Sequence, residues 1–186
     1  DDAIEESITY LDRIVARGEQ DPDWRRITDA SRPAPERSSA GAGEAAARQV
    51  AETIDAEVIA TFSSTGSTTL RVARERPGLP VIGLTPIEST ARRLSLVWGV
   101  QTVLTADPED LAHMVRKASQ IAFEEGFVKA GEGLVITAGV PLGSPGATNM
   151  IRLAFIDEHG LPDGHTPDEF PTGGKRRTPA VTKIPT

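Results

Sequence analysis

The sequence contains no cysteine, which excludes disulfide bonds, thiol catalysis and cysteine-ligated zinc. It also lacks any run of about eighteen apolar residues, the length that a membrane-spanning helix needs. The first residues, "DDAIEESITYLDRIV", are acidic and amphipathic, and we expect no signal peptide there. A cysteine-free chain is compatible with a reducing compartment. These absences lead us to expect a cytoplasmic protein that does not enter a membrane.

Positive charge is in short supply: 20 lysines and arginines face 27 aspartates and glutamates, for a net charge of −7. Nucleic acids and anionic membrane surfaces attract proteins through a positive field. The basic run "GKRR" at residues 174–177 is too short to supply that field on an acidic chain. We therefore expect small molecules or other proteins as partners, and neither nucleic acid nor membrane.

Histidine is also scarce, with only His113, His159 and His165. The first lies on the polar face of a predicted helix and the other two lie near the C-terminus. This scatter favours neither a metal centre nor a Ser-His-Asp site. We expect no catalytic residue and no metal on this chain.

Short apolar runs alternate with helical patterns from residue 39 onward. This alternation is typical of βαβ crossovers in a parallel sheet with helices on both faces. A last strand follows a loop that holds no helix, so we expect it to pair antiparallel at an edge. The prediction is a three-layer, doubly wound α/β fold of about five strands, four parallel and one antiparallel. The strands are predicted at 58–62, 80–84, 100–104, 134–137 and 150–156, and the helices at 42–54, 68–76, 88–98 and 108–126.

The residues on either side of this core have a different character. Residues 1–38 contain a helix with one apolar face, formed by Ile8, Leu11, Ile14 and Val15, followed by a helical turn around Trp24 and a linker. Residues 157–186 are rich in Pro, Gly and Thr without an apolar period, which predicts an extended or disordered tail. The α/β domain itself is assigned to residues 39–156.

The turn "SSTGST" directly follows the first predicted strand. Ligands of open α/β sheets bind beyond the carboxyl ends of the strands. Hydroxyls, a sharp glycine turn and the free amides at the start of the next helix make an anion site there. An ordinary helix cap at Ser67 or Thr68 is the alternative interpretation. The predicted phosphate-binding residues are Ser63, Ser64, Thr65, Gly66, Ser67 and Thr68.

A second loop, "GVPLGSPGATN", falls at the same predicted edge. Its glycines are flexible positions and its prolines are rigid ones. This combination is typical of a loop that closes as a lid over a neighbouring pocket. A plain connection to an edge strand is the alternative. The predicted lid residues are Gly139, Pro141, Gly143, Ser144, Gly146 and Thr148.

Both loops, together with "TPIESTARRLSLVWGV" and "EGLVITAGVPLGSPGATNMIRL", resemble the C-terminal, allosteric domain of pyruvate kinase. The resemblance covers residues 1–156, and "LDRIVARGEQDPDWR" resembles the helix that ends the family's catalytic barrel. It implies an effector phosphate at Ser63–Thr68, closed over by the loop 139–149. It also implies a homo-oligomer.

The resemblance further implies a parent enzyme that transfers phosphate from phosphoenolpyruvate to ADP with Mg²⁺ and K⁺. Those ions and the catalytic lysine belong to the family's barrel, of which this sequence shows only the last helix. We expect the chain alone to be inactive, with no cofactor of its own. The alternatives are a free-standing assembly domain without a ligand, and a weak phosphatase using a loop serine such as Ser64.

Activated members of the family carry basic residues at two phosphates, and the corresponding positions here are aligned with Ser64 and Glu125. A carboxylate would repel the second phosphate. The expected effector is therefore a sugar monophosphate or AMP in preference to fructose 1,6-bisphosphate. The adjacent Arg92 and Arg93 are interpreted as a solvated face or a subunit contact, and Leu94 and Trp98 as core or interface.

Overall fold

Five strands form one sheet in the order β3-β2-β1-β4-β5 in this computed structural model, which describes residues 2–140 and 148–164. The parallel strands are β1 (Val58–Phe62), β2 (Val81–Thr85), β3 (Val100–Leu104) and β4 (Gly133–Gly139). The fifth, β5 (Thr148–Phe155), pairs antiparallel with β4 at the edge. The predicted fold class is confirmed, including the antiparallel edge strand.

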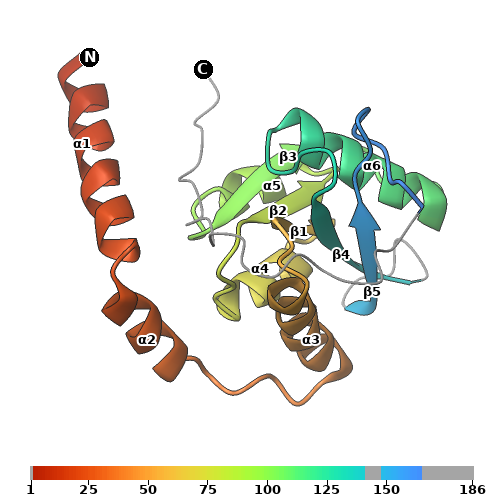
Figure 1. Cartoon of the computed structure of the whole chain (residues 1–186), viewed down its shortest axis with the longest axis horizontal. Coiled ribbons are helices and arrows are strands. Elements are labelled where there is room, and N and C mark those ends of the chain that lie inside the picture. Colours follow the sequence, from red (N-terminus) through yellow and green to blue (C-terminus); the bar gives the residue numbers. More distant parts are fainter. Residues whose placement is uncertain (1, 141–147, 165–186) are drawn as a thin grey trace.

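Helices cover both faces of this sheet (Figure 1). One face carries α3 (Ser39–Thr53), α4 (Ser67–Arg74) and α5 (Glu88–Leu94). The other face carries α6 (Leu111–Glu124). The predicted helices lie within a few residues of these bounds, except that α5 ends four residues earlier than predicted.

The alternation of side chains along each strand explains the two cores. In β1, Val58 and Ala60 belong to the cluster under α6, while Ile59 between them belongs to the cluster under α3 and α4. Side chains of a strand point to opposite faces in turn, so a strand covered on both sides needs apolar residues throughout. All five residues of β1 are buried.

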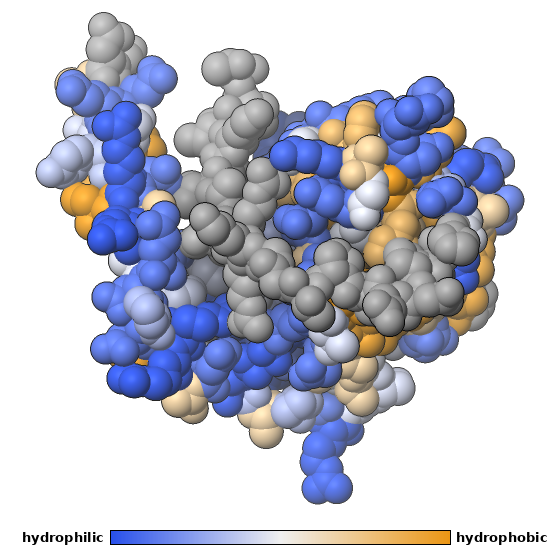
Figure 2. All heavy atoms as spheres, in the orientation of Figure 1, coloured by the Kyte–Doolittle hydropathy of each residue, from blue (hydrophilic) through white to orange (hydrophobic). Residues whose placement is uncertain are grey.

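The N-terminal residues form an arm beside this domain, built from α1 (Asp2–Glu19) and α2 (Pro22–Ala30) (Figure 1). The predicted helical turn around Trp24 is thus a full helix, because Asp21 caps its first turn and Pro22 occupies the first helical position. Three apolar side chains of α1 are at least half exposed: Ile8 at 50%, Leu11 at 61% and Ile14 at 53%. Figure 2 shows a few apolar side chains within an otherwise hydrophilic arm.

Candidate functional site

The carboxyl ends of the four parallel strands lie at one edge of the sheet, so the loops that follow them meet there. The Ser63 amide donates to the Leu84 carbonyl at 3.0 Å, and the Thr105 amide donates to the Thr85 carbonyl at 2.9 Å. Each of these bonds continues a strand pairing into the loop beyond it. The predicted anion loop, Ser63–Thr68, therefore begins at the position where such folds bind ligands.

Gly66 makes the turn from this loop into α4. Its φ is +79°, in the left-handed region that glycine adopts without strain. A Cβ at this position would lie 3.1 Å from the Thr90 side chain and 3.2 Å from that of Leu94. The turn therefore needs glycine for its backbone and for its packing, and the first amides of α4, which have no partner within the helix, follow directly.

Neighbouring elements hold the loop through its carbonyl groups. The Thr90 hydroxyl donates to the Ser64 carbonyl at 3.0 Å, and Arg93 donates through Nη2 to the Thr65 carbonyl. Both donors belong to α5. The loop is thus fixed on its carbonyl side by residues that follow β2, while the start of α4 supplies positive partial charge.

Arg93 brings a full positive charge to a loop that has no basic residue of its own. The neighbouring Arg92 behaves differently, because its guanidinium pairs with Glu88 at 2.5 Å on the exposed side of α5. Both arginines are exposed, as a solvated face predicts, and Arg93 in addition binds the loop through the Thr65 carbonyl. Sequence reasoning missed Arg93 because the contact spans 28 positions and depends on β2 lying beside β1.

The loop and the end of the predicted lid are joined by a pair of buried hydroxyls. Thr68 Oγ1 lies 2.8 Å from Thr148 Oγ1, and these residues are only 6% and 1% exposed. Of the other predicted lid residues, Gly139 ends β4, whereas Pro141, Gly143, Ser144 and Gly146 lie outside the described residues. The two predicted loops therefore meet through Thr68 and Thr148.

Asn149 ties together the two ends of the 140–149 segment. Its side-chain oxygen accepts from the Val140 amide at 2.8 Å, and its side-chain nitrogen donates to the Val140 carbonyl at 2.7 Å. A pair of bonds of this kind fixes the side-chain amide in one orientation. The segment thus starts and ends at a fixed point beside the anion loop.

Glu44 on α3 is a buried carboxylate next to this meeting point. Its side chain is 1% exposed, and its Oε1 lies 3.9 Å from Nη1 of Arg71 on α4, too far for a hydrogen bond. Burial raises the pKa of Glu44 to about 6, and the Thr148 hydroxyl and the Arg71 guanidinium offset that effect only in part. Glu36 and Glu75 raise the pKa further.

Glu125, which the sequence alignment set against a second phosphate, lies elsewhere. Its carboxylate accepts from Gln101 Nε2 at 2.9 Å, and Gln101 is the second residue of β3. Glu125 follows the last residue of α6, at the end of the sheet opposite the carboxyl ends. The expected repulsion by Glu125 was therefore wrong, and with it the charge argument against a second phosphate.

Within the described part of the chain, no group of three or more His, Cys, Asp or Glu side chains is placed to hold a metal ion. His113 lies on α6, where its Nδ1 accepts from the Glu109 amide at 3.4 Å. His159 lies in a turn after β5, beside Glu158. No helix of the described residues is long and apolar enough to cross a membrane.

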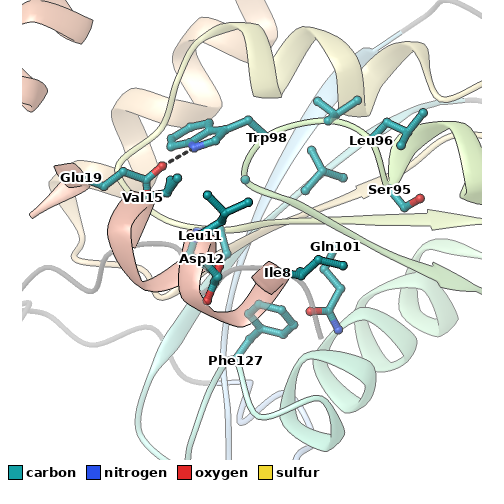
Figure 3. A pocket seen from close by; sticks show the side chains of 14 residues that line it. Ile8, Leu11, Asp12, Val15, Glu19, Ser95, Leu96, Trp98, Gln101 and Phe127 are labelled. Atoms are coloured by element: carbon teal, nitrogen blue, oxygen red, sulfur yellow. Dashed lines mark hydrogen bonds between the residues drawn. The ribbon is translucent and has the colours of Figure 1, made fainter. Parts of the chain in front are cut away.

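An open apolar groove of about 430 Å³ lies between α1 and the β3 edge of the domain. Ile8, Leu11 and Val15 of α1 face it across from Leu96 and Phe127 (Figure 3). Its end is closed by a hydrogen bond of 2.5 Å from the Trp98 indole to Glu19. The groove has few polar groups that could orient a phosphorylated ligand, so it is a poorer candidate for effector binding than the loop edge.

Comparison with known proteins agrees with this arrangement. A model of the family described as "Pyruvate kinase, alpha/beta domain" matches residues 44–154. Pyruvate kinase of Methylorubrum extorquens is 42% identical over 151 residues, covering 81% of this chain and 32% of the relative. A pyruvate kinase of Agrobacterium vitis is 34% identical over 148 residues, covering 80% and 31%. That of Staphylococcus aureus is 30% identical over 154 residues, covering 83% and 26%.

The chain spans about a third of the length of the first two of these relatives. The family match begins in α3, passes through all four parallel strands and ends in β5. It includes the anion loop and both ends of the 140–149 segment. The chain therefore belongs to the pyruvate kinase family, and its sheet is that family's C-terminal alpha/beta domain.

Proposed function

We propose that this chain is the regulatory and assembly domain of a cytoplasmic pyruvate kinase, and that it binds a phosphorylated metabolite at Ser63–Thr68. The observation that carries the proposal is the hydroxyl pair of Thr68 and Thr148, which joins the anion loop to the base of the 140–149 segment at the start of α4. A ligand phosphate at the α4 amides would contact both segments. Its binding would then change their relative stability, which is how an effector shifts an equilibrium between states.

Three groups favour a phosphate at this position. The Thr68 and Thr69 amides of the first α4 turn can donate hydrogen bonds, whereas the Ser67 amide already donates to Thr65 Oγ1 at 3.4 Å. The helix dipole adds about half a positive charge, and Arg93 adds a whole one. Arg93 takes the place of a basic residue within the loop, where this chain has Ser64. We propose a sugar monophosphate or AMP as the ligand class, because Arg93 is the one full positive charge that the described residues show in contact with the loop.

The parent enzyme would convert phosphoenolpyruvate and ADP to pyruvate and ATP with Mg²⁺ and K⁺. The described residues offer no acidic cluster that fits either ion, so no step of that reaction is assigned to this chain. The proposed assembly is a homo-oligomer, and β5 supports it as an edge strand of the sheet. Edge strands present unpaired backbone groups to a second chain.

Calorimetric titration tests the ligand proposal. The probes are ribose 5-phosphate, glucose 6-phosphate, AMP and inorganic phosphate, each added to the chain and to two variants. Arg93→Ala should weaken binding of the best probe at least about tenfold, as expected for one charged hydrogen bond. Arg92→Ala is the matched control on the same helix and should bind normally. Absence of binding by every probe, or equal losses in both variants, would reject the loop as an effector site and leave assembly as the role.

A further inference from the structure

A second hollow, of about 570 Å³, lies between the end of α1, α2, the end of α4 and Trp98. Its volume is in the usual range for small-molecule sites. It is separated from the anion loop by the whole of α4, whose eight residues span about 12 Å. The loop lies at the start of that helix and this hollow, which we call the tryptophan pocket, lies at its end.

Two tryptophans form the aromatic part of the tryptophan pocket. The rings of Trp24 and Trp98 lie 5.7 Å apart between centroids and are tilted by 43°. The Trp98 indole donates to Glu19 at 2.5 Å, so its polar group is already satisfied. The Trp98 ring is thus held between α1, α2 and the turn after α5, and both tryptophans line the hollow.

Arginines form the charged part. Arg32, Arg74 and Arg76 all line the pocket, and the Arg76 guanidinium carbon lies 4.8 Å from the centre of the Trp98 ring. Arg32 is paired with Asp29, whereas Arg74 and Arg76 form no ion pair with any described residue. The opposing negative charges are the carboxylate of Glu19, which also lines the pocket, and the half charge at the end of α4, so the pocket keeps a small positive excess.

The backbone of Arg76 ends α4 and sets the position of its side chain at the pocket. Its φ is +49°, in the left-handed region, which costs a non-glycine residue about 1–2 kcal/mol. Arg76 directly follows Glu75, the C-cap of α4, at the position where a left-handed residue commonly ends a helix. The chain turns there, and the Arg76 guanidinium lies over Trp98 at the rim of the pocket.

We propose that the tryptophan pocket binds a small phosphorylated ligand with a planar ring, of the nucleoside monophosphate class. The ring lies against Trp24, whose neighbour Trp98 is already covered by Arg76, and the phosphate meets Arg74 and Arg76. Guanidinium groups suit phosphate because their planar donors match its oxygens, and stacking of a base on an aromatic ring is favourable for any base. The proposal does not depend on ligand binding at Ser63–Thr68.

Intrinsic fluorescence gives a local test, because both tryptophans of the sequence lie in this pocket. AMP is added while tryptophan emission is followed, with excitation at the red edge of indole absorption and free tryptophan amide as the optical control. We expect a saturable change in emission. Ribose 5-phosphate lacks the base and adenosine lacks the phosphate. Each should reach half of its maximal emission change at a concentration at least about tenfold higher than AMP does.

Variants separate this pocket from the anion loop. Arg74→Gln should weaken AMP binding at least about tenfold, and Arg116→Gln, an exposed arginine on α6, should not. Arg93→Ala, at the anion loop, should leave the fluorescence titration unchanged. Thermal melting confirms that each variant is folded, as expected for exposed side chains. The proposal is overturned by an emission change that does not saturate, by equal affinities of Arg74→Gln and Arg116→Gln, or by loss of the signal in Arg93→Ala.

Discussion

Thr68 and Thr148 share a hydrogen bond of 2.8 Å although they are 80 positions apart in the chain. Thr68 stands in the first turn of α4 and Thr148 is the first residue of β5. Both hydroxyls are buried and out of reach of solvent. Each therefore forms with the other the hydrogen bond that it would form with water in the unfolded chain. The contact is the direct physical link between the anion loop and the segment that precedes β5.

Thr68→Val should destabilise the domain by about 1 kcal/mol, because it removes one buried hydrogen bond and leaves Glu44 as the remaining polar neighbour of the Thr148 hydroxyl. At pH 4, where Glu44 is protonated, the double variant Thr68→Val with Thr148→Val should regain most of that loss, since replacing both partners by apolar groups of the same shape is nearly neutral. Urea unfolding of the two single variants and the double variant measures the coupling. Additive losses would mean that the two hydroxyls do not depend on each other.

Glu52 joins the N-terminal arm to the domain. Its carboxylate accepts from Arg25 of α2 at 3.0 Å and from Arg48 of α3 at 2.8 Å, and all three side chains are less than a quarter exposed. Burial lowers the pKa of Arg48, and the charge of Glu52 opposes that shift. Removing Glu52 leaves the two partly buried guanidinium groups with the more distant Asp29, at 3.5 Å from Arg25 and 3.9 Å from Arg48.

Glu52→Ala should therefore lower the free energy of unfolding by about 2–3 kcal/mol, somewhat less than the loss for a fully buried pair. Hydrogen exchange should rise in α2 more than in α6. The control is Glu88→Ala, which breaks the exposed pair with Arg92 and should change stability by less than about 1 kcal/mol. Equal effects of the two substitutions would show that the arm is not held through Glu52.

Gly66→Ala should destabilise the anion loop through both backbone and packing. A left-handed non-glycine residue costs about 1–2 kcal/mol, and the new methyl would crowd Thr90 and Leu94 at 3.1 Å and 3.2 Å. Gly99→Ala is the matched control, because Gly99 also has a positive φ, of +71°, but has nothing within 4 Å of the added methyl. Chemical denaturation should show a larger loss for Gly66→Ala, and the difference measures the packing of α5 on the loop.

The sheet was predictable because each strand has an apolar pattern that can be recognised in its own few residues. In β1 the run Val58–Phe62 is apolar on both faces, and the same pattern recurs between helical stretches, so parallel order follows from general rules. The limits of such reasoning show at α5, predicted to reach Trp98 but ending at Leu94. Beyond that residue the chain leaves the helical path, and Trp98 packs on Trp24 and Glu19, contacts that no local pattern encodes.

For the candidate site, the sequence predicted where the loops lie but not which side chains from other elements contact them. The positions of Ser63–Thr68 and of Thr148 follow from the order of strands and loops, whereas the Arg93 contact needs α5 to be placed against the loop. The misplacement of Glu125 has the same origin. An alignment by eye gives a residue's place along the chain, but the end of the sheet it occupies depends on the direction in which α6 runs.

Glu44 makes the stability of the domain depend on pH in an unusual direction. Its pKa is about 6 in the folded chain against 4.5 for an unperturbed carboxyl, so the folded state holds its proton more tightly. Below pH 4.5 both states are protonated and the group has no net effect. As pH rises through 4.5 and then 6, the unfolded state loses its proton first, and stability falls by about 2 kcal/mol.

Glu44→Gln removes this titration while keeping the shape of the side chain. The variant should be more stable than the parent by about 2 kcal/mol at pH 8, and the difference should vanish near pH 4. Urea unfolding at pH 4, 6 and 8 gives the comparison. Glu36→Gln, which removes the same charge from an exposed position near Arg71, should show no such trend. If Glu44→Gln destabilises the domain at pH 8, the carboxylate is instead held by charge pairing with Arg71, and the argument from burial fails.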